Sequence, residues 1–169
     1  MKKLFLVLAF AFAGIFTANA QVWVGGGLGA QFGKEISSFS LAPEVGYAFN
    51  NHWQVALGTS YTFEKTVIPN SNPIAKSYLD LEPYVRYVAT TIGDKFSLFF
   101  DLTGDFGLVD HSGWATTLRP GIAWMATEHW TAAFRYGFVG YDHGYYGADN
   151  GFFLNCNLVA PEIRLYYNF

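Results

Sequence analysis

Apolar and polar residues alternate along most of this chain. The alternation is clearest in four similar segments, each with a proline at its third position. The segments are Leu41–Tyr47, Leu81–Tyr87, Leu118–Trp124 and Val159–Leu165. Such a period of two is the mark of a β-strand whose two faces meet different surroundings. The prolines lie 40, 37 and 41 residues apart. That spacing suits one hairpin per segment, so four segments predict about eight strands.

The alternation and the turn residues place the strands along the sequence. Short turns follow the even strands and longer loops follow most odd ones, although the first connection, 33–38, is barely longer than a turn. Alternating turns and loops are typical of an up-and-down antiparallel β-barrel. The predicted strands cover residues 22–32, 39–49, 53–63, 77–89, 96–107, 115–125, 130–139 and 153–169.

The first 20 residues have the composition of an export signal. Lys2 and Lys3 precede the apolar stretch Leu4–Phe16, and Ala18 and Ala20 form a small-residue cleavage site. The apolar stretch is too short for a membrane-spanning helix, which needs about 20 residues. Residue 21 is glutamine rather than cysteine, which argues against a lipid anchor. We therefore expect residues 1–20 to be a cleaved signal peptide and residues 21–169 to form the barrel domain.

Composition supports an exported barrel in a membrane. Aromatic residues make up 20% of the chain and charged residues only 14%. Without the two lysines of the leader, 8 basic and 13 acidic residues remain, giving a net charge of −5. Nucleic acid selects basic surfaces, so it is not an expected partner. An exported, aromatic-rich chain of alternating segments predicts an all-β transmembrane barrel. Because proline cannot donate to a strand ladder, the repeated prolines predict irregular points in the wall.

Charged residues gather on the face opposite the apolar one. In a barrel with a lipid-facing exterior, this face lines the interior. The interior of an eight-stranded barrel is just wide enough for side chains to fill, and one guanidinium can bridge two carboxylates. The sequence therefore predicts a bore closed by a charge network. Its expected members are Glu44, Asp80, Glu82, Arg86, Asp101, Asp105, Arg119, Arg135, Glu162 and Arg164.

The chain resembles the small outer-membrane β-barrel domain family of Gram-negative bacteria in three features. These are the signal peptide, the four L-x-P-x-V-x-Y-like segments and the ending Ile163–Phe169. The resemblance implies residence in the bacterial outer membrane, with outer-membrane lipids as partners. The ending carries apolar residues at alternate positions and closes on an aromatic residue. In that family, such an ending resembles the signal read by the barrel assembly machinery. The signal residues would be Ile163, Leu165, Tyr167 and Phe169.

The resemblance leaves the activity open, because this fold carries anchors, adhesins, channels and enzymes. We expect a monomer with a structural or surface-interaction role, without catalysis, cofactor or metal. An extracellular ligand would bind through loops 141–153 and 64–76, the first of which is rich in Tyr, Gly and Asp.

Two alternatives remain open. One is a lipid A- or phospholipid-modifying enzyme at the outer rim, where Asp110-His111-Ser112 and Asp142-His143 lie. Adjacent residues of an extended chain point to opposite sides, so Asp110-His111-Ser112 is not by itself a catalytic triad. The other alternative is a narrow channel for small solutes.

Overall fold

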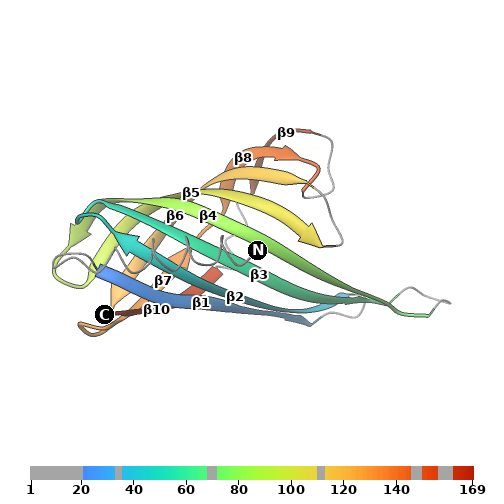
Figure 1. Cartoon of the computed structure of the whole chain (residues 1–169), viewed down its shortest axis with the longest axis horizontal. Helices are drawn as coiled ribbons and strands as arrows, with labels where there is room; N and C mark the ends of the chain where they lie inside the picture. Colours follow the sequence, from blue (N-terminus) through green and yellow to red (C-terminus); the bar gives the residue numbers. More distant parts are fainter. Residues whose placement is uncertain (1–20, 33–35, 68–71, 110–112, 146–149, 156–161) are drawn as a thin grey trace, which may run out of the picture.

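The computed structural model describes residues 21–32, 36–67, 72–109, 113–145, 150–155 and 162–169. Within these ranges, no helix is both long enough and apolar enough to cross a membrane. Figure 1 shows an antiparallel β-barrel. Its strand segments are β1 (Gln21–Phe32), β2 (Ile36–Ala48), β3 (Trp53–Thr66), β4 (Ile74–Ile92), β5 (Phe96–Val109), β6 (Trp114–Met125), β7 (Trp130–Arg135), β8 (Phe138–His143), β9 (Gly151–Asn155) and β10 (Glu162–Asn168).

The wall closes on itself. Strands β1 to β7 pair antiparallel in chain order, β7 pairs with β10, and β10 pairs with β1 from Trp23↔Asn168 to Gly27↔Arg164. β7 and β8 are two parts of the seventh wall strand, while β9 and β10 belong to the eighth. The predicted all-β, eight-stranded, up-and-down barrel is therefore confirmed. The start of β1 and the end of β10 lie together at the short-turn end, where the N–H of Phe169 donates to the carbonyl of Val22 at 3.1 Å.

The seventh strand is interrupted, contrary to the prediction of a single strand over 130–139. β6 pairs with β7 as far as Gly121↔Arg135 and resumes with β8 at Leu118↔Val139. Two residues of β6 thus oppose the three residues 136–138, which is a β-bulge. Gly137 takes a φ of 54° in this bulge, a left-handed conformation that glycine adopts without steric cost.

The prolines lie at irregular points of the wall, as predicted. Pro43, Pro83 and Pro120 each pair with the preceding strand, but the ladder to the following strand has no pair at the proline. The ladder misses its pair on one side because proline has no N–H to donate. Pro161 and Cys156, both placed in the last predicted strand, lie outside the described residues.

Two hairpins at the loop end are longer than predicted. β3 continues to Thr66 and β4 begins at Ile74, so only residues 67–73 of the predicted loop 64–76 lie between strands. The pair Glu64↔Lys76 helps to extend this ladder, because opposite charges across a strand pair stabilise it. β8 and β9 likewise take up both ends of the predicted loop 141–153. In Figure 1 the β8–β9 hairpin flares away from the β1–β4 part of the wall.

Candidate functional site

The charged residues predicted for the interior all stand on the inward positions of their strands. Eight of the ten are buried, and Asp101 is fully so at 0% exposure. The eight are Glu44, Asp80, Glu82, Arg86, Asp101, Asp105, Arg135 and Arg164. Arg119 and Glu162 are partly exposed. Neighbouring positions on β5 and β6 face outward, which follows from the two-residue period of a strand.

Asp101 is the centre of one ion cluster. The Arg86 guanidinium meets it through two parallel bonds, from Nε to Oδ1 at 2.7 Å and from Nη2 to Oδ2 at 2.9 Å. Arg135 donates from Nε to the same Oδ2 at 2.8 Å. The two parallel bonds from Arg86 are the strongest geometry for an arginine–carboxylate pair. One buried carboxylate thereby joins side chains from β4, β5 and β7.

Arg164 on β10 is the centre of a second cluster. Its Nη1 donates to Glu44 on β2 at 2.5 Å, and its Nη2 donates to Glu82 on β4 at 2.9 Å. Its Nε donates to Glu162 on its own strand. A single guanidinium therefore contacts three carboxylates, a use that its planar set of five donors allows and that a lysine ammonium would not match.

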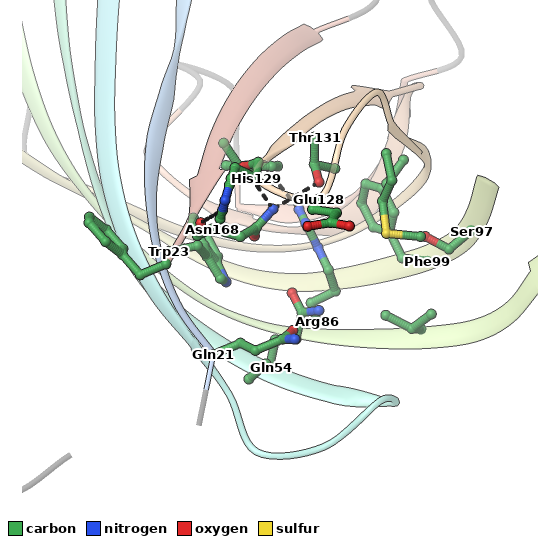
Figure 2. A pocket seen from close by; sticks show the side chains of 16 residues that line it. Gln21, Trp23, Gln54, Arg86, Ser97, Phe99, Glu128, His129, Thr131 and Asn168 are labelled. Carbon is green, nitrogen blue, oxygen red and sulfur yellow. Dashed lines mark hydrogen bonds between the residues drawn. The ribbon is translucent and has the colours of Figure 1, made fainter. Parts of the chain in front are cut away.

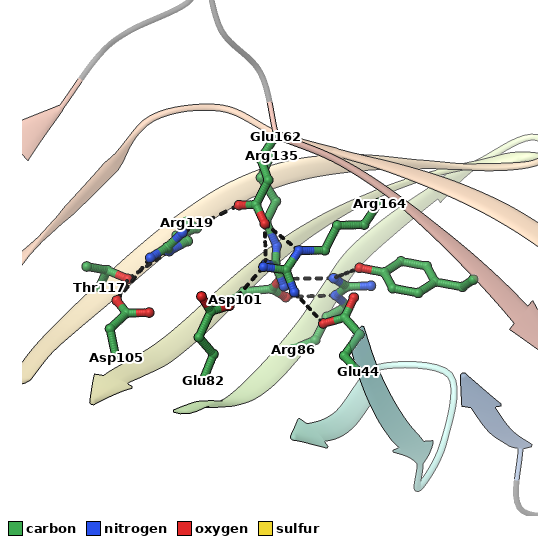
Figure 3. Close-up of polar contacts among 11 residues, drawn as sticks. Glu44, Glu82, Arg86, Asp101, Asp105, Thr117, Arg119, Arg135, Glu162 and Arg164 are labelled. Atoms are coloured by element: carbon green, nitrogen blue, oxygen red, sulfur yellow. Dashed lines mark hydrogen bonds and ion pairs between the residues drawn. The ribbon is translucent and has the colours of Figure 1, made fainter. Parts of the chain in front are cut away.

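Glu162 links these clusters to a third. It accepts from Arg135 and from Arg119, each at 3.4 Å, in addition to Arg164. Arg119 also donates to Asp105 at 2.9 Å. Nine of the ten predicted residues thus form one continuous network, drawn in Figure 3, with members from six wall strands. The tenth, Asp80, is buried on β4 two residues before Glu82.

A layer of aromatic side chains adjoins the charges on the side of the short turns. Trp23, Tyr84, Phe99 and Tyr166 are each at most 4% exposed. The Arg86 guanidinium lies 3.9 Å from the centre of the Phe99 ring, and it donates to the Tyr166 hydroxyl at 3.2 Å. The sequence prediction did not include this layer. Strand parity carried the signal, since Tyr84 and Phe99 each stand two residues before a predicted interior charge.

Inward glycines make room for these rings. A Cβ atom on Gly46 would lie 2.0 Å from the Trp23 ring, and one on Gly121 would lie 2.3 Å from the Phe99 ring. Real Cβ atoms do not approach other atoms so closely, so any larger residue would displace the ring. The small residues between the interior charges are therefore part of the packing of the bore.

The bore opens at the short-turn end into a cavity of about 240 Å³, which Figure 2 shows. Trp23, Arg86, Phe99 and Tyr166 line it, together with polar side chains such as Gln54. Water entering from this end therefore meets the aromatic rings together with Arg86 of the ion network.

The rim residues considered for catalysis are arranged differently. Asp142 is buried at 2% exposure, and its carboxylate accepts from the Tyr145 N–H at 2.9 Å. His143 is exposed, and its ring centre lies 5.5 Å from that of Trp114 on the outer side. The two adjacent side chains thus point to opposite sides of the strand. Asp110, His111 and Ser112 lie outside the described residues. Across the described ranges, no group of three or more His, Cys, Asp or Glu residues is placed to hold a metal ion.

The chain ends were predicted to carry two signals. Ile163, Leu165 and Phe169 are exposed on the outer face, and the Tyr167 ring packs against the Phe169 ring with centres 5.2 Å apart. Recognition of this ending by the barrel assembly machinery stays a prediction. Residues 1–20, with Ala18 and Ala20, lie outside the described residues, so cleavage there also stays a prediction.

Comparison with solved structures finds a similar fold in the Yersinia pestis outer membrane protein Ail, whose backbone structure was determined in a phospholipid bilayer nanodisc. The TM-score is 0.51 with 12% sequence identity, over 89% of this chain and 98% of that one. No protein-family model matches the sequence, and no curated protein matches it. At this identity the likeness concerns the fold, which is that of an eight-stranded outer-membrane β-barrel.

Proposed function

We propose that this chain is an integral outer-membrane barrel whose bore is closed by its own side chains, and that its role is structural or surface-interacting rather than catalytic. The observation that carries the proposal is the continuous network of nine charged residues contributed by six wall strands. A lipid environment is supported by the apolar side chains on the outer face, among them Leu57, Leu102 and Ile122, which are 39–52% exposed.

Closure of the bore follows from two layers in series. The first layer is Asp101 with its two arginines. Its carboxylate is closed to solvent, because Asp101 is fully buried. In the second, the rings of Trp23, Phe99 and Tyr166 pack around Arg86 where the cluster meets the cavity at the turn end. A hydrated ion would have to separate bonded charges and displace packed rings. An eight-stranded barrel has little interior volume for either movement.

A closed bore leaves the loop end as the surface available for recognition. The β3–β4 and β8–β9 hairpins supply loops 64–76 and 141–153, through which an extracellular ligand would bind. Phe152 on β9 is 87% exposed, and its ring contacts that of Tyr141 across the hairpin. Exposed aromatic residues supply large contact area with few rotatable bonds, which suits a binding surface.

Conductance in planar bilayers tests the closed bore. The wild-type protein should give no steady channels. A double variant, Arg135→Ala with Phe99→Ala, removes material from both layers and should raise conductance. The matched control Phe100→Ala removes the neighbouring outward ring and should leave the bilayer silent. Stable ion-selective channels from the wild-type protein would replace this proposal with a channel function.

Lipid analysis tests the absence of catalysis. The purified barrel would be incubated in vesicles that contain lipid A and phospholipid, and the lipids would then be measured by mass spectrometry. Unchanged lipid masses are expected. Time-dependent hydrolysis or acyl transfer that is lost in a His143→Ala variant would establish a rim enzyme instead.

A further inference from the structure

Two short turns at the same end of the barrel share one construction. In the β2–β3 turn, the Asn50 side chain accepts hydrogen bonds from the N–H groups of His52 and Trp53, at 2.8 and 2.9 Å. In the β6–β7 turn, the Thr127 hydroxyl accepts from the N–H groups of the corresponding His-Trp pair, His129 and Trp130, at 3.3 and 3.0 Å. Each turn thus fixes a histidine immediately before the first strand residue.

Each histidine is bound to the neighbouring strand by the same pair of contacts. The His52 carbonyl accepts from the Val88 N–H at 2.8 Å, and its Nδ1 lies 2.9 Å from the Val88 carbonyl oxygen. His129 repeats both contacts with Asn168, at 2.7 and 3.0 Å. A carbonyl oxygen only accepts, so Nδ1 must carry the proton in both rings. In the neutral imidazole, Nε2 is then a bare acceptor, and for both histidines the described residues supply it with no hydrogen bond.

Both rings lie over tyrosines of the outer face. The His52 ring is stacked on Tyr87, with centres 6.1 Å apart and planes 27° apart. The His129 ring is stacked on Tyr167, with centres 5.5 Å apart and planes 21° apart. The adjoining tryptophan touches the same tyrosine in each case, with ring centres at 4.9 Å for Trp53 and 5.3 Å for Trp130. We call these two groups, His52-Trp53-Tyr87 and His129-Trp130-Tyr167, the inner-rim clusters.

We propose that each inner-rim cluster binds the primary ammonium headgroup of an aminophospholipid, with the histidine Nε2 accepting a hydrogen bond from that ammonium. Trp53 and Trp130 are 48% and 50% exposed, and together with Phe96 and Trp124 they form an aromatic girdle near the short turns. Such girdles mark the height of the lipid headgroups. In the membrane, the group that lies beside the inner-rim clusters is therefore a lipid headgroup.

The chemistry of the clusters selects among headgroups. A bare acceptor suits a ligand with a hydrogen-bond donor, and exposed aromatic faces attract a cation. A primary ammonium supplies both, whereas a choline headgroup has the charge but no N–H. A phosphate supplies neither and would need a protonated histidine. In addition, the two turns are separated by four strands of an eight-stranded wall, so the clusters lie on opposite sides and should bind independently.

Lipid retention tests this proposal. The full barrel would be placed in nanodiscs with equal phosphatidylethanolamine, phosphatidylcholine and phosphatidylglycerol of matched acyl chains, and the lipids kept after release would be counted by native mass spectrometry. Up to two ethanolamine lipids should be retained, with about fivefold enrichment over choline lipid, the factor expected for one net hydrogen bond.

The informative variant is His52→Asn with His129→Asn. The asparagine amide nitrogen can take the place of Nδ1 and keep the bond to the strand carbonyl, but the position of Nε2 is lost. Ethanolamine enrichment should disappear in this double variant. His143→Asn is the matched control, because that exposed histidine also packs on a tryptophan but at the loop end, and it should retain the full enrichment.

Three results would overturn the proposal: no ethanolamine enrichment in the wild-type protein, equal enrichment in the double variant, or loss of phosphatidylglycerol retention in its place, which would assign the clusters to phosphate. If the double variant does not fold, the wild-type protein still decides. The ¹⁵N shift of Nε2 in His52 and His129 should differ between ethanolamine-only and choline-only bilayers, and identical shifts would refute the contact.

Discussion

Replacing Arg164 by methionine should be among the most destabilising single changes in this barrel. The Arg164 guanidinium contacts Glu44, Glu82 and Glu162, whose side chains are 0%, 11% and 33% exposed. Glu162 keeps Arg119 and Arg135 as partners after the change. Glu44 loses its guanidinium partner while still buried, and Glu82 loses its contact as well.

The magnitude follows from the cost of leaving a buried charge without its partner. Breaking one buried pair by removing one member costs about 3–5 kcal/mol. Because Arg164→Met removes the partner of more than one carboxylate, we expect a loss at the upper end of that range, about 5 kcal/mol. The outward variant Leu98→Val removes one methylene from a side chain that is 36% exposed, and it should cost about 1 kcal/mol or less.

The assay is reversible urea unfolding of the protein in lipid vesicles, followed by tryptophan fluorescence. A triple variant, Arg164→Met with Glu44→Gln and Glu82→Gln, separates charge from packing. If lost pairing is the cause, neutralising the two carboxylates should restore most of the free energy of unfolding. An Arg164→Met protein within about 1 kcal/mol of wild type, the range of an exposed ion pair, would refute this reasoning. The interior charges would then be hydrated and weakly coupled.

Five further outcomes are expected. Intact mass of protein from outer membranes should show a mature chain that begins at Gln21. In detergent gels, unboiled protein should migrate differently from boiled protein, and deletion of Phe169 should reduce membrane insertion while export continues. Gly121→Val should cost about 1–3 kcal/mol of unfolding free energy, because the new side chain overlaps the Phe99 ring. Gly137→Val should cost about 1–2 kcal/mol, because its φ is positive.

Specific results would contradict three of these expectations. A retained leader in the mature protein would remove the signal-peptide assignment. Equal insertion with and without Phe169 would show that the final aromatic residue is not an assembly signal. Stability unchanged by Gly121→Val would mean that the bore is loosely packed.

The interior charges could be predicted because strand parity is unbroken where they stand. In the seventh strand, the alternation of inward and outward residues shifts by one position. Arg135 faces inward from an odd position, yet Asp142 faces inward from an even one, because the bulge at Gly137 adds a residue between them. A single glycine within an apolar strand was the available signal, but it does not by itself distinguish a bulge from a close packing contact.

The aromatic layer inside the bore could not be predicted from residue type alone. Tyr84 faces the bore and Tyr87 the exterior, and Phe99 and Phe100 divide in the same way. Aromatic residues suit both faces of this barrel, so only the register decides which ring is buried. The length of the outer hairpins was also missed. It depends on pairs such as Glu64↔Lys76, which stabilise strands in a stretch whose composition is that of a loop.

Barrel closure pairs the last strand segment, β10, with the first one, β1. During synthesis one edge of β1 therefore has no ladder partner until the end of the chain has been made and exported. Closing so long a loop carries a large entropy cost before any contact rewards it, so this step should come late in folding. A chain that lacked the seven residues of β10 would not be a smaller barrel. It would be an open sheet with two edges whose backbone groups are unpaired. Such edges would be poorly tolerated in lipid and prone to pair with another copy.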